Sequence, residues 1–61
     1  MSKALMVFAD GFETVEALMT VDILRRGGVE VTMASIYDSL DVTSSQDVTI
    51  HVDSLLKNLL A

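Results

Sequence analysis

The chain has 61 residues, of which 51% are hydrophobic, with two Phe, one Tyr, no Trp and no Cys. A chain of this size buries only about 60% of its unfolded surface, and without cysteines it can form neither a disulfide scaffold nor a cysteine-based zinc site. Nine acidic residues against four basic ones give a net charge of -5, which repels phosphate backbones and argues against nucleic acid as a partner.

The first predicted element is an apolar strand at residues 4–9. The run is continuously apolar rather than alternating, which is typical of a parallel strand covered on both faces, so we expect a central strand. It is shorter than the core of a signal peptide, and Asp10 follows at once. We therefore expect neither export nor a membrane span, and a cytoplasmic location.

A helix is predicted over residues 12–26, where good helix formers follow one another without Pro or Gly. Asp10 and Glu13 have the spacing of a capping box, and Gly27-Gly28 can adopt the left-handed conformation that ends a helix. Apolar side chains are spread around this helix, so more than one side should be buried. Either other polypeptide covers it, or helix 12–26 forms a homodimer contact.

Residues 29–35 alternate apolar with polar side chains, which predicts a second strand nearer to a sheet edge. The strand, helix and second strand together predict a right-handed crossover between parallel strands. The predicted fold class is therefore α/β. Because few large side chains are present to close a core, we expect residues 1–61 to be the incomplete amino-terminal part of a single domain, completed by other polypeptide.

A small hairpin is predicted over residues 42–52, with its turn at 44–47. Asp53 or Ser54 can then cap a short final helix at residues 55–60. No linker or internal repeat divides the chain, which favours one structural unit.

Two carboxylates, Glu13 and Glu16, follow the first strand directly, where open α/β sheets place ligand crevices. The turn lacks both the glycine spacing of dinucleotide sites and a P-loop lysine, so we expect no nucleotide cofactor. Glu16 precedes an apolar stretch, and an apolar environment favours the protonated carboxyl group, which can donate a hydrogen bond or a proton. The alternative is that both acids only complement the helix dipole.

The sequence resembles the amino-terminal segment of the ThiJ/PfpI superfamily over nearly all of its length. The most specific features are the turn Gly11-Phe12-Glu13 with Glu16, the segment 21–28 and the following Val-x-Val-Thr strand. The resemblance implies a flavodoxin-like parallel-sheet sandwich, of the type found in class I glutamine amidotransferases. It also implies that Glu16 is catalytic, because the matching Glu of the family hydrogen-bonds a reactive Cys through its protonated carboxyl group.

The resemblance further implies that the nucleophile of Glu16 lies outside this chain, on a second polypeptide segment. A hydrogen bond from a neutral acid stabilises the thiolate, which is the reactive form of Cys. The leading expectation is an activity on small reactive carbonyls such as glyoxals, of glyoxalase or deglycase type, with no cofactor and no metal. The alternative is a stress-responsive chaperone, or a redox sensor whose oxidised Cys is stabilised by Glu16.

Two residues are further candidates on the substrate or dimer side. These are Glu13 and Arg26, of which Arg26 could reach a neighbouring subunit's site in a family-type dimer or could simply stabilise the end of its helix. Several family members have Arg where Gln46 stands, which argues against anion binding at that position.

The remaining polar residues are predicted to be structural. Asp22 should be hydrogen-bonded structure, and His51 should be a surface histidine far from any metal-binding cluster. A more distant alternative is a phospho-accepting receiver domain that uses Asp10. It requires a second Asp at the end of another central strand, which the sequence does not offer.

Overall fold

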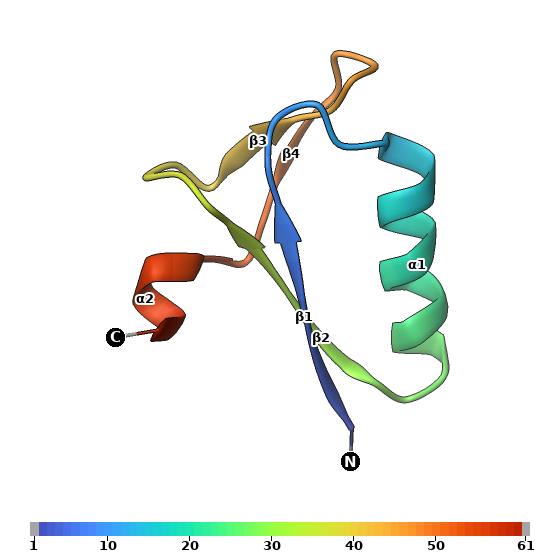
Figure 1. Ribbon diagram of the computed structural model, residues 1–61. Coiled ribbons are helices and arrows are strands. Elements are labelled where there is room, and N and C mark those ends of the chain that lie inside the picture. The colour runs from blue at the N-terminus through green and yellow to red at the C-terminus, as the bar shows by residue number, and fades with distance from the viewer. Residues whose placement is uncertain (1, 61) are drawn as a thin grey trace.

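The structure, a computed structural model, describes residues 2–60 (Figure 1). It confirms the α/β class and the predicted order of strand, helix, strand, hairpin and helix. The elements are β1 (Lys3–Phe8), α1 (Thr14–Arg26), β2 (Glu30–Ser35), β3 (Asp41–Thr43), β4 (Thr49–His51), β5 (Ser54–Leu55) and α2 (Leu56–Leu60). Within residues 2–60, neither helix is long and apolar enough to cross a membrane.

A parallel sheet in the order β1-β2-β5 is the centre of the molecule. β1 and β2 pair in register from Lys3 opposite Glu30 to Phe8 opposite Ser35, as the predicted crossover requires. The expectation that the first strand is central and the second nearer to an edge is wrong for the described residues. Ser54–Leu55, which we had assigned to the final helix and its cap, instead pairs with β2, so β2 lies in the middle and β1 has a single neighbour.

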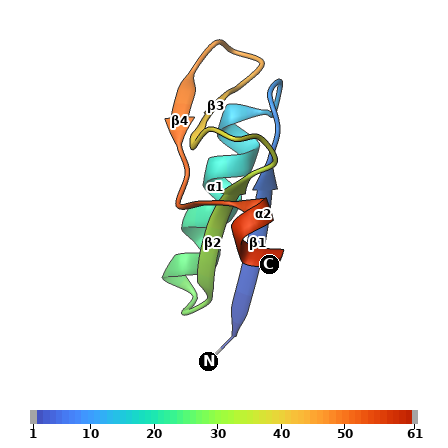
Figure 2. The same ribbon diagram turned by 90° about the vertical axis from the view of Figure 1, so that its left-hand side faces the viewer.

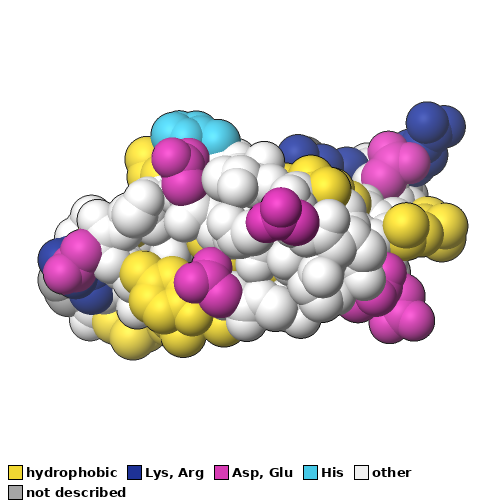
Figure 3. Space-filling view, turned by 90° about the horizontal axis from the view of Figure 1, so that it is seen from above, with side chains coloured by type: hydrophobic (Ala, Val, Ile, Leu, Met, Phe, Trp, Pro, Cys, Tyr) yellow, Lys and Arg dark blue, Asp and Glu magenta, His cyan; other side chains and the backbone are white. Residues whose placement is uncertain are grey.

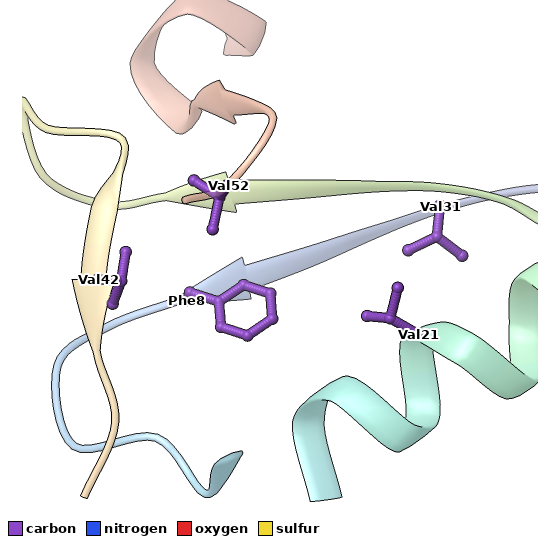
Figure 4. Packing of buried hydrophobic residues seen from close by; sticks show 5 residues of the cluster. All are labelled: Phe8, Val21, Val31, Val42 and Val52. Carbon is purple, nitrogen blue, oxygen red and sulfur yellow. The ribbon is translucent and has the colours of Figure 1, made fainter. Parts of the chain in front are cut away.

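The two helices lie on opposite sides of this sheet, as the two views in Figures 1 and 2 show. On the α1 side, a core forms between the sheet, the helix and the hairpin (Figure 4). Its buried members are Phe8, Val21, Val31, Val42 and Val52. The ring of Phe8 meets that of Phe12 edge to face at 4.9 Å, a favourable aromatic geometry.

Helix α1 begins at Thr14, and the predicted capping box at its start is wrong. Glu13 occupies the N-cap position with extended backbone but without a side-chain cap hydrogen bond. The Asp10 carboxylate is already engaged elsewhere, because it accepts a hydrogen bond from the Thr43 amide at 3.1 Å. The acid that would have capped the helix therefore holds the hairpin.

The other end of α1 agrees with the prediction. Gly28 has a φ of 88°, a left-handed conformation that favours glycine. Its amide donates to the Arg25 carbonyl at 3.1 Å, and the Val29 amide donates to the Leu24 carbonyl at 2.9 Å. These bonds satisfy carbonyl groups of the last turn, and the chain reverses into β2.

The predicted hairpin is confirmed, with β3 and β4 antiparallel from Asp41 opposite His51. Its turn places Asp47 at a φ of 63°. His51 lies at the surface as predicted, with 71% of its side chain exposed, and its Nδ1 is 3.0 Å from Asp41. Within residues 2–60 no group of three metal-ligating side chains forms around this pair.

The predicted cap of the last helix is wrong. The Asp53 carboxylate accepts hydrogen bonds from the Met33 amide at 2.8 Å and from Arg25 at 3.3 Å, so it connects β2 and α1 instead. Because Ser54–Leu55 has become β5, helix α2 begins one residue later than expected, at Leu56.

Candidate functional site

The candidate site lies at the end of the molecule where β1 finishes and α1 begins. Seen from this end, Asp and Glu side chains are spread over the surface (Figure 3). Within residues 2–60 no pocket is present. The predicted crevice is therefore open surface within the described residues.

The turn between β1 and α1 is held by the β3–β4 hairpin through backbone hydrogen bonds. The Gly11 amide donates to the Thr43 carbonyl at 2.9 Å, and the Ser45 amide donates to the Phe12 carbonyl at 2.8 Å. With the bond from the Thr43 amide to the Asp10 carboxylate, these contacts fix the path of the chain into the helix.

Gln46 extends this attachment to the helix itself. Its Oε1 accepts hydrogen bonds from the Thr14 amide at 3.1 Å and from the Thr14 hydroxyl at 2.8 Å, while its Nε2 donates to Glu13 at 2.9 Å. Gln46 thus takes the role that we had predicted for Asp10. Sequence reasoning missed it because its partners lie far away along the chain, although the predicted hairpin could have placed them close together.

Glu16 lies on the first turn of α1, immediately beyond the end of β1, as predicted. The apolar environment expected around it is absent from the described residues, where Glu16 is exposed. Its neighbours Val15 and Met19 are themselves 61% and 54% exposed, so they shield it little. Within residues 2–60 the Glu16 carboxylate has no hydrogen bond or ion pair, and only its backbone carbonyl is engaged, by the Thr20 hydroxyl at 2.7 Å.

Glu13 lies close to Glu16, whereas Arg26 does not. Arg26 ends α1 and Glu16 begins it, so a rise of about 1.5 Å per residue separates them by roughly 15 Å along the axis. Arg26 donates to both carboxylate oxygens of Asp22 at 3.1 Å. This confirms Asp22 as hydrogen-bonded structure, and within one chain it leaves Arg26 apart from the two acids.

The receiver-type alternative gains no support from the sheet. Asp10 follows β1, but its carboxylate is hydrogen-bonded to Thr43. The neighbouring strands end at Ser35 and Leu55, so neither supplies a second aspartate at this edge. Among residues 2–60, the arrangement offers the exposed carboxyl group of Glu16, without a side-chain hydrogen bond, at the carboxyl end of the parallel sheet.

Comparison with known proteins assigns the whole described segment to one group. The model of the DJ-1/PfpI family matches residues 2–61. DJ-1beta of Drosophila melanogaster is 42% identical over 57 residues, which are 92% of this chain and 30% of that protein. The chain spans only 13% to 30% of the length of the first curated relatives.

Solved structures agree with this assignment. The oxidized DJ-1 of Toxoplasma gondii superimposes with a TM-score of 0.93 and 36% identity, over 97% of this chain and 32% of that one. A cysteine-to-alanine variant of a DJ-1 superfamily protein from Salmonella typhimurium gives a TM-score of 0.91 and 38% identity, over 95% of this chain and 31% of that one.

Proposed function

This chain belongs to the DJ-1/PfpI family and has its flavodoxin-like fold, and from this premise we propose that it supplies Glu16 to a reactive cysteine on a second polypeptide segment. The observation that supports this most directly is the exposed Glu16 carboxyl group, which has no partner within residues 2–60. The chain itself contains no cysteine. The cysteine-to-alanine variant of the Salmonella typhimurium protein shows that this relative carries one.

The proposed reaction is of glyoxalase or deglycase type. A thiolate adds to the aldehyde carbon of a small 2-oxoaldehyde, and the carboxyl group of Glu16 stabilises the thiolate and exchanges a proton with the reacting oxygen. The hydrogen on that carbon then moves to the neighbouring carbonyl carbon, which leaves a thioester, and water breaks the C–S bond to release the acid and restore the thiol. One 2-oxoaldehyde and one water molecule thus give one 2-hydroxy acid, and no external oxidant or reductant takes part. Packing of the second segment over Glu16 would supply the apolar environment that favours its neutral form.

The partners are proposed from two exposed apolar surfaces. On α1, Val15, Met19 and Ile23 form a stripe at helical spacing and are 61%, 54% and 60% exposed, which supports a homodimer contact through this helix. On the sheet, Leu5 and Val7 face away from α1 and are 48% and 46% exposed. We assign that face to the cysteine-bearing segment, because parallel sheets are normally covered on both sides. We also propose that this protein is located in the cytoplasm.

The second candidate function is a non-enzymatic one. The Toxoplasma gondii relative was solved in an oxidized form, which favours a redox sensor or stress-responsive chaperone in which Glu16 stabilises an oxidised cysteine. In that case a peroxide transfers oxygen to the thiolate and no carbonyl compound is consumed.

The test begins with the complex as it exists. The chain is purified under native conditions from its own source, and its components are identified by intact mass after denaturation. A cysteine-bearing polypeptide is expected, together with turnover of methylglyoxal. Replacing Glu16 with Gln should lower kcat by at least about 100-fold, the usual contribution of a positioned acid or base.

The matched control is Glu30→Gln, which removes an exposed carboxylate paired with Lys3 at the opposite end of the sheet. It should leave turnover unchanged. Absence of a cysteine-bearing partner, or turnover that is indifferent to Glu16→Gln, would contradict the proposal. If a peroxide oxidises the cysteine and methylglyoxal is not turned over, the redox function is favoured instead.

A further inference from the structure

A network of hydrogen bonds joins the hairpin to the turn that leads into α1. Each residue from Asp10 to Thr14 is hydrogen-bonded to the segment 43–46, at distances of 2.8 to 3.1 Å. Three of these six bonds use the backbone of the hairpin, and the other three use the side chain of Gln46. Gln46 is the member that contributes through its side chain, and it bonds the two residues nearest to the helix.

We infer that Gln46 is a positioning residue for Glu16, an inference that rests on the function proposed for Glu16. The first amide groups of any α-helix have no partner within the helix. In α1 the N-cap residue Glu13 makes no side-chain cap hydrogen bond, and the amide of the first helical residue, Thr14, donates to Gln46 Oε1 at 3.1 Å. The cap is supplied across space by the hairpin.

The amide group of Gln46 suits both contacts at once. Thr14 presents N–H and O–H donors and therefore needs an acceptor, whereas the Glu13 carboxylate needs a donor. Only the orientation with Oε1 towards Thr14 and Nε2 towards Glu13 satisfies both, and this is the orientation observed. A carboxylate at position 46 would repel Glu13, and a cationic side chain would have no acceptor for Thr14.

The connection from this cap to Glu16 is short. Thr14 and Glu16 belong to the same first turn of α1. Because the Glu16 carboxylate has no side-chain partner within residues 2–60, its position is set by the backbone that carries it. Loosening the first turn therefore moves Glu16, whereas Val21, the buried residue of α1, lies on a later turn.

Three substitutions separate the two contacts of Gln46. Gln46→Ala removes both, Gln46→Glu keeps the acceptor for Thr14 and loses the donor to Glu13, and Gln46→Arg keeps a donor and loses the acceptor. Val48→Ala serves as the control, because Val48 is an exposed residue of the same hairpin and does not belong to the core cluster or the residues packed against it.

The first measurement is NMR on the full chain. In Gln46→Ala and Gln46→Arg the Thr14 amide should exchange with solvent about fivefold faster, which is the effect of losing a typical cap, and the Glu16 carboxyl resonance should shift. Gln46→Glu should restore the exchange rate. The amide of Ala34, in β2, should keep its exchange rate in all variants, which distinguishes local positioning from general destabilisation.

The second measurement is the turnover of methylglyoxal by the complex with the cysteine-bearing polypeptide. Gln46→Ala should lower kcat roughly tenfold with little change in KM, because misplacement of a catalytic group by a fraction of an ångström affects the chemical step, and Gln46→Glu should recover part of the loss. If Glu16→Gln abolishes turnover while Gln46→Ala leaves kcat and the Thr14 exchange rate unchanged, the positioning role is wrong. If Glu16→Gln has no effect, the proposed function itself fails.

Discussion

The two faces of the parallel sheet differ sharply in how far this chain covers them. On the α1 side, Phe8 and Val31 are 1% and 6% exposed, whereas Leu5 and Val7 on the opposite side of β1 are 48% and 46% exposed. All four residues lie on the paired strands β1 and β2. The difference in exposure therefore comes from what packs on each side of the sheet. Within residues 2–60, α1 and the hairpin cover one side of the sheet, whereas on the other side α2 leaves Leu5 and Val7 of β1 exposed.

The largest expected effect is a loss of folding stability from a substitution in the core on the α1 side of the sheet. Phe8→Ala removes the aromatic side chain at the centre of the core and should destabilise the fold by about 3 to 5 kcal/mol, enough to abolish cooperative unfolding in a domain of this size. Leu5→Ala, on the open face, should change the free energy of unfolding of the same chain far less. Denaturant titrations of both variants, followed by circular dichroism, test this, and equal losses would refute the contrast between the two faces.

An intermediate effect concerns the open face and its proposed occupant. Val7→Lys places a charge on the uncovered side of β1, and surface substitutions of this kind change stability by about 0.5 kcal/mol or less. Binding to the cysteine-bearing segment should nevertheless weaken by at least tenfold, because the interface would bury an unpaired charge. The control is Met19→Lys on the α1 stripe, which should disturb self-association instead. If the Val7→Lys variant binds the cysteine-bearing segment as well as the unchanged chain does, that segment does not pack on this face of the sheet.

The smallest effect involves the side of the sheet that carries α2. Lys57 donates a hydrogen bond to Asp38 at 2.6 Å, and this bond, with the attraction between the charges, holds the pKa of Asp38 below its ordinary value of 3.8. A carboxyl group whose pKa is lower in the folded state stabilises the fold above its ordinary pKa. That contribution is lost as the pH falls through the folded value.

The Lys57→Gln variant tests this pair. In an NMR titration the midpoint of Asp38 should move up towards 3.8. Because both partners of the Asp38 pair are exposed, thermal stability should change little. If the Asp38 midpoint does not move, Lys57 of α2 does not pair with Asp38 in the loop between β2 and β3.

Local sequence signals predicted the elements well and the links between them poorly. The glycine stop of α1 at Gly28 and the hairpin turn were predictable because each depends on a few adjacent residues. The cap of α1 and the pairing of β5 were not, because Gln46 reaches Thr14, and Ser54 reaches Ala34, only after the chain has folded. The environment of Glu16 was beyond prediction for another reason, since no described residue buries its side chain.

The uninterrupted apolar composition of β1 has a consequence for how this polypeptide exists in a cell. Within residues 2–60 its outer edge pairs with no strand, and between Lys3 and Asp10 no charged residue or proline interrupts it. Such an edge is a template for further strands, including those of other copies. Molecules made in excess of the proposed cysteine-bearing segment should therefore aggregate or be degraded, so under this proposal the supply of that segment should set how much of this chain accumulates.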